Sequence, residues 1–388
     1  MYKQYFKNFT SSDASTLHMA AHSHHAWPDC TLKAHTQYWH DAAKMMDDKW
    51  SYIFGTIIPD VQKGIAKRLN LSDHTTITFA PNTHDLLVRL FSCFGGKKVK
   101  ILATDSEFHS FSRQAKRWAE EGLAEVRLID AQPFESFNQR FAEAAHTFDP
   151  DFIYFSHVFF NSGAVVSDLE GLIQILPERA VIAVDGYHGF MALPTDLSPL
   201  EDRIFYLSGG YKYAMSGEGV CFMHCPKGWL PRPVDTGWYA GFAALEQPQD
   251  GAVAYGTCGS RFMGATFDPS GLYRMRAVFN WLDGLNLDVA TIHAYVQGLQ
   301  KHFLSLLAAE SHPTFHLNQL VPTLEVAERG HFLTFQTADA AKLYTLLHQQ
   351  GIMTDYRANR LRFGFGIYHG KQDITAFYTQ LLALLRTI

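Results

Sequence analysis

One lysine stands between two tyrosines in the segment SGGYKYAMSGEG, residues 208–219, and small residues surround it. Glycine lacks a side chain, so it lets the backbone and a ligand approach closely. The lysine amine can form a Schiff base with a carbonyl compound. Lys212 can therefore face a bound molecule, although a solvated loop lysine would have the same local sequence.

Two other loops carry residues that could bind the same molecule. In APNTHDLL, Asn82, Thr83 and His84 lie where a helix is predicted to begin, and the free N–H groups of a helix N-terminus bind phosphate. Taken alone, this segment could be a simple N-cap. In DSEFHSFSRQ, Phe108 is placed where a flat ring could stack on a ligand or could join the core.

A carboxylate and an imidazole follow a further apolar run. The segment AVIAVD ends at Asp185, and His188 lies three residues later. A carboxylate at this position can keep a heterocyclic nitrogen protonated. His188 could be an ordinary core histidine, but its spacing from Asp185 favours a hydrogen bond to the same ligand.

The elements that must position these residues form an alternating pattern. Between about residues 76 and 224, amphipathic helical segments separate short β-branched and aromatic runs. These runs are TITF, VKILAT, EVRLID, FIYFS, AVIAVD, RIFYLS and GVCFMHC. The alternation is typical of a parallel α/β sheet. Ligands of such sheets bind beyond the carboxyl ends of the strands, where the candidate residues lie.

A phosphate cradle, a stacking ring, a carboxylate and a lysine in this order are the components of a pyridoxal 5′-phosphate (PLP) site. The chain resembles a fold type I PLP enzyme of the class V aminotransferase group, and within it kynureninase. The family's Asp-x-x-His is matched by Asp185 and His188, and its Tyr-Lys-Tyr motif is matched by Tyr211, Lys212 and Tyr213.

Further residues take their roles from this resemblance. It implies that Thr83, Tyr211, Trp238 and Thr266 hold the phosphate, with Thr266 reaching it from a neighbouring subunit. It also implies that a C-terminal arginine holds the substrate carboxylate, with Arg362 as the first match and Arg357 as the second. Asn82, His84, Phe108 and His188 complete the predicted cofactor site. Lys212 and Asp185 are the predicted catalytic residues.

The resemblance implies an α/β fold of the PLP-dependent transferase type I. Its large domain has a mostly parallel central sheet, and a small α+β domain follows. We predict an N-terminal arm over residues 1–60 that lines the active site, a large PLP-binding domain over 61–270 and a small C-terminal domain over 271–388. A homodimer with shared active sites is also expected.

The N-terminal segment HMAAHSHHAW departs from the kynureninase pattern, and so does Ala265-Thr266-Phe267, which replaces Gly-Thr-Pro. Because such positions belong mostly to the substrate side of the pocket, they put the substrate in doubt rather than the cofactor. His22 and His24 are predicted to line the mouth and to bind substrate. The spacing of the histidine cluster does not favour a metal site.

Composition excludes several other classes. The 388 residues carry a net charge of −5, and no large basic cluster indicates nucleic-acid binding. No apolar run is long enough to span a membrane and no signal peptide is evident, so a cytoplasmic location is expected. The five scattered cysteines predict free thiols rather than a disulfide framework.

The sequence is compatible with three functions. Cleavage of a side-chain bond in a small amino acid or amine, as in kynureninase, is slightly favoured over transamination. The third is a non-catalytic PLP-binding protein. Cysteine desulfurases of the same group are set aside, because they need a cysteine in a loop of the C-terminal domain and no cysteine follows Cys258.

Overall fold

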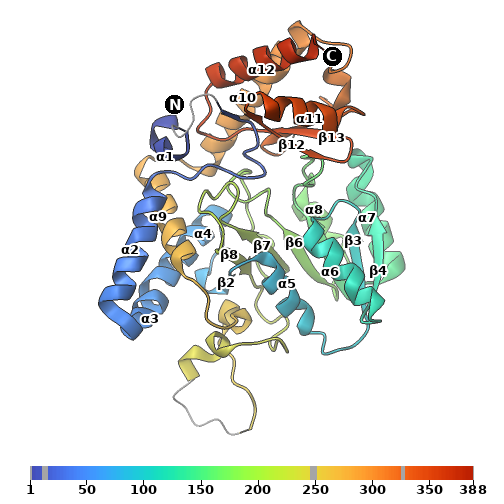
Figure 1. Cartoon of the computed structure of the whole chain (residues 1–388). Coiled ribbons are helices and arrows are strands. Elements are labelled where there is room, and N and C mark those ends of the chain that lie inside the picture. Colours follow the sequence, from blue (N-terminus) through green and yellow to red (C-terminus); the bar gives the residue numbers. More distant parts are fainter. Residues whose placement is uncertain (1, 11–15, 245–250, 325–327, 388) are drawn as a thin grey trace.

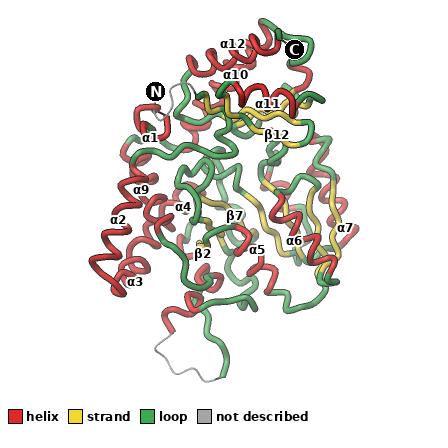
Figure 2. Tube along the Cα trace, viewed as in Figure 1, coloured by secondary structure: helices red, strands yellow, loops and turns green. Residues whose placement is uncertain are grey.

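The computed structural model describes residues 2–10, 16–244, 251–324 and 328–387. The described chain contains a seven-stranded sheet, a four-stranded sheet and a two-stranded sheet. Helices surround the strands of the large sheet, and the C-terminal elements lie above it in the view of Figure 1. Figure 2 shows the same separation, with the strands of the smaller sheets near the C-terminal helices.

The large sheet has the strand order β2-β8-β7-β6-β5-β3-β4. Its strands are β2 (Ile77–Ala80), β3 (Val99–Thr104), β4 (Ala124–Ile129), β5 (Phe152–Ser156), β6 (Val181–Asp185), β7 (Ile204–Gly209) and β8 (Cys221–His224). Only β8 pairs antiparallel with its neighbours, β2 and β7, while the other strand pairs are parallel. The predicted mostly parallel sheet is therefore confirmed.

Burial explains the apolar runs that predicted these strands. Every residue of β5, β6 and β7 is buried, as expected for strands covered by helices on both faces. Strand β4 lies at the edge and alternates more strongly between exposed and covered residues. The carboxyl ends of β3, β5, β6 and β7 consequently meet along one edge of the sheet.

The helices include long amphipathic segments and several short turns. The α-helices are α1 (Lys7–Thr10), α2 (Cys30–Met45), α3 (Lys49–Tyr52), α4 (Ile58–Leu69), α5 (Thr83–Ser92), α6 (His109–Glu120), α7 (Phe137–Phe148), α8 (Leu169–Gln174), α9 (Ser270–Gly284), α10 (Val289–Ala309), α11 (Ala340–Gln349) and α12 (Lys371–Leu385). The shorter helical turns are η1 (Lys3–Tyr5), η2 (Met46–Asp48), η3 (Ile53–Ile57), η4 (His74–Thr76), η5 (Phe134–Ser136), η6 (Trp238–Ala244), η7 (Cys258–Phe262) and η8 (Leu317–Gln319).

The C-terminal part and the N-terminal segment are joined through strands. The four-stranded sheet has the order β12-β13-β10-β9, and β1 pairs parallel with β11 in the two-stranded sheet. These strands are β1 (Leu17–His18), β9 (Leu320–Val321), β10 (Phe332–Gln336), β11 (Ile352–Met353), β12 (Asp355–Arg357) and β13 (Arg360–Gly364). A bridge between Ala20 and Gly364 continues the contact, so the start of the chain lies beside β13.

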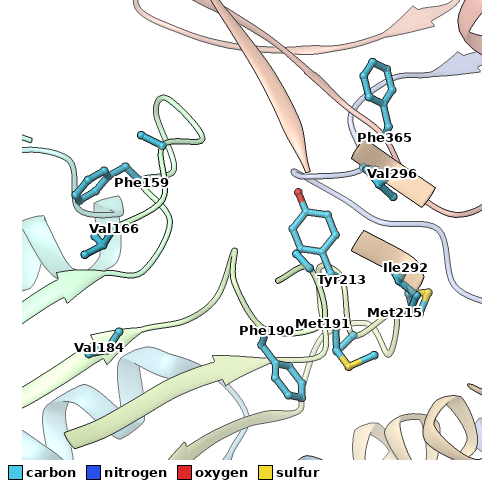
Figure 3. Packing of buried hydrophobic residues seen from close by; sticks show 14 of the residues in the cluster. Phe159, Val166, Val184, Phe190, Met191, Tyr213, Met215, Ile292, Val296 and Phe365 are labelled. Atoms are coloured by element: carbon cyan, nitrogen blue, oxygen red, sulfur yellow. The ribbon is translucent and has the colours of Figure 1, made fainter. Parts of the chain in front are cut away.

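The hydrophobic core continues from the large sheet into the C-terminal part. Figure 3 shows Tyr213 between the loops of the large sheet and the side chains of Ile292, Val296 and Phe365, and all four belong to one buried cluster with Val184. Helix α9 packs against both α2 and α4. The division into residues 1–60, 61–270 and 271–388 remains our proposal.

Two further observations concern the described residues. Among them, no helix is both long and apolar enough to cross a membrane. All five cysteines are free, as the sequence predicts.

Candidate active site

Residues that follow five strands of the large sheet line one cavity of about 480 Å³. These strands are β2, β3, β5, β6 and β7. The other side of the cavity is formed by residues of the N-terminal segment and of β12 and β13. The predicted site residues in the lining are His22, Asn82, Thr83, Phe108, Asp185, His188, Tyr211, Lys212, Arg357 and Arg362. Most of the residues that the sequence singled out therefore lie around one space.

Lys212 follows β7, and its amine is enclosed by aromatic and polar groups. Its Nζ lies 2.6 Å from His188 Nε2, and 5.5 and 5.0 Å from the ring centres of Phe108 and Tyr187. Burial lowers the pKa of Lys212 to about 7, and the charge of Arg362 acts in the same direction while Asp185 opposes it. Much of this amine is therefore neutral near neutral pH.

Asp185 ends β6 and is held on two sides. Its Oδ1 accepts a hydrogen bond from the Tyr187 backbone N–H, and its Oδ2 accepts one from the Tyr154 hydroxyl, each at 2.9 Å. Burial raises the pKa of this carboxyl group, while the two hydrogen bonds and the Lys212 charge favour its ionised form. A fixed carboxylate at a cavity wall can bind a protonated ring nitrogen.

His188 contributes a neutral imidazole. Burial, followed by the charges of Lys212 and Arg362, lowers its pKa well below the ordinary value. Its Nδ1 is buried and has no hydrogen-bond partner among the described residues. A neutral ring beside Lys212 can accept or donate one hydrogen bond without adding a charge.

The start of α5 lies at the same cavity. Asn82 is its N-cap, and its side chain accepts a hydrogen bond from Asp85 N at 2.9 Å. The first N–H groups of a helix, here beginning at Thr83, have no partners inside the helix, and the cap satisfies that of Asp85. The N-cap and the phosphate-site interpretations are thus compatible. His84 does not line the cavity.

Phe108 lies at the start of α6, where the backbone is still extended. Its side chain is 41% exposed, which is unusual for a residue of the core. The ring of Phe160 meets it edge-on with centres 5.6 Å apart. Phe108 can therefore offer a free ring face to a planar ligand.

Two arginines lie on the opposite wall. Arg362 is 3% exposed, and burial lowers its pKa to about 10. It contacts the Asp355 carboxylate and donates to the Phe160 backbone carbonyl. Arg357 Nη1 lies 2.6 Å from Asp355 Oδ1. A carboxylate entering the cavity would meet two guanidinium groups that already share one acidic partner.

The histidines of the N-terminal segment take different places. His22 lines the cavity, and its ring stacks on Phe332 with centres 4.6 Å apart. His24 is not part of the lining, but its Nδ1 lies 3.1 Å from the Tyr211 hydroxyl. In the described residues no group of three possible metal-binding side chains is found. His24 thus contacts a residue of the cavity lining without lining the cavity itself.

Trp238 and Thr266 lie outside the cavity lining. Trp238 Nε1 donates a hydrogen bond to Thr266 Oγ1 at 2.9 Å, and both residues are exposed. Within a single chain, they do not join the other residues predicted to bind the phosphate. Their predicted role would require a second subunit, so it stays a proposal.

Glu107 lies directly behind the cavity lining and was not singled out from the sequence. It is 3% exposed, and its Oε2 accepts a hydrogen bond from Ser156 Oγ at 2.6 Å. Ser156 lines the cavity and pairs with Asp185 in the sheet register. Burial and then the charge of Asp185 raise the pKa of Glu107 to about 8, against the opposing hydrogen bonds of Ser156 and Thr104. Its position directly before Phe108 was the available signal.

Comparison with known proteins identifies the family. The aminotransferase class-V family model matches residues 17–377, so the chain belongs to this family. No curated protein matches the sequence significantly.

Several solved structures share the fold. One is a lysine-to-alanine mutant of C-DES with glycine covalently linked to the PLP cofactor; it is 15% identical, has a TM-score of 0.80, and the match covers 98% of each chain. Another is the cystine C–S lyase C-DES with its product cysteine persulfide, at 16% identity and a TM-score of 0.78, covering 95% of this chain and 97% of that chain. The cysteine desulfurase CsdA from Escherichia coli is 17% identical, with a TM-score of 0.78, covering 99% and 98% of the two chains.

These comparisons confirm the predicted PLP-dependent type I fold, and PLP is the cofactor in the C-DES structure. They do not support a particular closeness to kynureninase. The similar structures reported above are a C–S lyase and a cysteine desulfurase. The short motifs that suggested kynureninase consist mostly of predicted cofactor-binding residues, and none of these comparisons tests them.

Proposed function

We propose that this protein is a PLP-dependent enzyme that binds an amino acid and breaks a bond in its side chain. The observation that carries the proposal is the Lys212 amine, which is enclosed beside Asp185 and His188 and has a pKa lowered to about 7. Such an amine can serve both as a nucleophile and as a base at neutral pH.

The residues around the cavity fit PLP by their chemistry. Lys212 would attach the cofactor, Asp185 would bind its ring nitrogen, Phe108 would cover one ring face, and Thr83 with the start of α5 would bind the phosphate. Neutral His188 would lie beside the attachment point. When bound, PLP supplies an electron sink that stabilises negative charge on the carbon next to an amino group.

The chain's own groups would then position the substrate and move its protons. Arg362 and Arg357 would hold the carboxylate by charge-assisted hydrogen bonds. The neutral amine of Lys212 would accept the proton from Cα. The amine and His188 Nε2 are 2.6 Å apart, so a hydrogen bond between them would keep the amine at this place.

A contact between Tyr211 and His24 supports our proposal of side-chain cleavage over simple transamination. Tyr211 lines the cavity, its hydroxyl lies 3.1 Å from His24 Nδ1, and burial raises its pKa. The Tyr211 hydroxyl, at the cavity, could donate a proton to a group that leaves the substrate side chain, a step that transamination does not require. We propose this role for Tyr211 in addition to the predicted contact with the phosphate.

The bond that is cut could be C–C or C–S. Kynureninase-like hydrolysis rests on the Tyr-Lys-Tyr and Asp-x-x-His motifs, and C–S cleavage rests on the likeness to C-DES. Desulfurase chemistry that uses a cysteine nucleophile is not favoured. Cys221, the cysteine in the cavity lining, is buried, and burial raises its pKa to about 12.

Transamination is the second candidate, because the family model is that of class V aminotransferases. A panel of amino acids that includes kynurenine and cystine separates the two functions. The PLP-loaded protein is mixed with each compound without a keto acid, and the cofactor spectrum and products are followed. Continuous consumption of one amino acid is expected, whereas a single conversion of the cofactor that waits for a keto acid would establish transamination instead.

A further inference from the structure

The two arginines of the cavity share a single acidic residue. Asp355 begins β12 and lies directly opposite Arg362 of β13 in the antiparallel register. Its Oδ1 lies 2.6 Å from Arg357 Nη1, and its Oδ2 contacts Arg362 Nη2. One carboxylate therefore bridges two guanidinium groups.

Asp355 stands behind the arginines rather than in the cavity. Both arginines line the cavity, whereas Asp355 does not and is 7% exposed. Asp355 does not occupy every donor of the two arginines. The Nε atoms of Arg357 and Arg362 are buried without a hydrogen-bond partner among the described residues. The Arg357 side chain is 40% exposed, so a ligand in the cavity can meet its guanidinium group, which Asp355 holds in place.

The charge of this group is smaller than its arginines suggest. Arg357 and Arg362 contribute two positive charges and Asp355 removes one, which leaves a net charge of +1. His22 lies 3.7 Å from Asp355 Oδ2, but burial lowers its pKa well below the ordinary value, so it adds no charge. Since charges interact strongly in a buried site, this net charge of +1 affects how tightly an anionic ligand binds.

We propose that Asp355 is the specificity-determining residue that makes this wall accept one carboxylate and disfavour a dicarboxylate. It holds both guanidinium groups in place and cancels one of their charges. A single α-carboxylate then matches the remaining charge, while a second carboxylate finds no free cation in the pair. The inference rests on the proposed function and narrows its substrates to amino acids with an uncharged or cationic side chain.

Two simple carboxylates without an amino group test this inference. Propionate carries one carboxylate and succinate carries two, and neither can react with the cofactor. Their dissociation constants are measured on the PLP-loaded protein by ligand-observed NMR. The wild-type protein is expected to bind propionate at least as tightly as succinate. Tighter binding of succinate by a factor of about ten, or no binding of either compound, would overturn the proposal.

Asp355→Asn leaves both arginine charges in place. It is expected to increase the affinity for succinate relative to propionate by about tenfold. Asp355→Asn with Arg357→Gln restores the net charge of +1 and should restore the wild-type ratio. Asp60→Asn is the matched control. Asp60 also forms an ion pair with an arginine, Arg276, at a distance of 2.7 Å, but neither residue lines the cavity. An unchanged ratio in Asp355→Asn would mean that Asp355 only supports the fold, which contradicts the proposal.

Arg357→Gln alone is informative if Asp355→Asn does not fold. It lowers the net charge to zero, so the affinities for both carboxylates should fall, with succinate losing more; an equal loss contradicts the proposal. These binding ratios are independent of turnover. If no amino acid is consumed or converted but the ratios change as expected, then the proposed function fails while the role of Asp355 stands.

Discussion

The lowered pKa of Lys212 leads to a large and measurable difference in reactivity. An ordinary lysine with a pKa of 10.5 has roughly one neutral amine in three thousand at pH 7, whereas a pKa of about 7 leaves about half of the amines neutral. Because only the neutral amine is a nucleophile, the reactive fraction of Lys212 at this pH should be about a thousandfold larger than its ordinary basicity would give.

Competitive labelling of the PLP-free protein measures this pKa directly. A trace of an amine-acylating reagent is added at a series of pH values, and mass spectrometry quantifies the label on Lys212 and on exposed Lys33 as an internal reference. Labelling of Lys212 should rise with pH and reach half of its maximum near pH 7.

Two variants show whether the stated cause is correct. Asp185→Asn removes a charge that raises the Lys212 pKa, so the midpoint should move to lower pH. Asp105→Asn is the matched control, because Asp105 is an exposed acid that does not line the cavity. A Lys212 midpoint above pH 9 in the wild-type protein would refute the reasoning.

Three further predictions concern a buried acid, a charge contact and the assembly. Glu107 keeps its proton up to about pH 8 in the folded protein but loses it near pH 4.5 in the unfolded chain. The free energy of unfolding should therefore fall as pH rises between these values, by at most about 1.4 kcal/mol per pH unit. Glu107→Gln should weaken that decline in thermal unfolding between pH 5 and 7, and an unchanged pH dependence would contradict the assignment. Arg362→Gln should weaken amino-acid binding by about 10- to 100-fold, as expected for loss of a charge-assisted hydrogen bond, while Arg360→Gln, two residues away, should not. Sedimentation velocity should detect a dimer, and Trp238→Ala, which removes the Thr266 contact, should weaken PLP retention; a fully active monomer would exclude shared sites.

Much of the fold follows from patterns that leave few alternatives. The runs FIYFS and AVIAVD are apolar up to their last residue because β5 and β6 are covered on both faces. The site residues that were predicted to lie together share a simple reason. Each ends or follows a strand of the mostly parallel sheet, so Thr83, Phe108, Asp185 and Lys212 reach one edge.

The positions of the remaining residues depend on contacts between distant parts of the chain, which local sequence patterns do not predict. Glu107 contacts Ser156 at the end of β5, and Asp355 meets Arg362 through the register of two short strands. The expectation for Trp238 depends on a second chain. The suggestion of kynureninase rested on short motifs, which reflect the cofactor's chemistry more than the substrate's.

The central claim is that Lys212 holds PLP, and one measurement tests it most directly. The purified protein is loaded with PLP, treated with sodium borohydride to make the attachment permanent, digested and analysed by mass spectrometry. The account predicts a stoichiometric pyridoxyl phosphate label on the peptide that contains Lys212, with no label above background on other lysines. A label on a different lysine, or none, would contradict it.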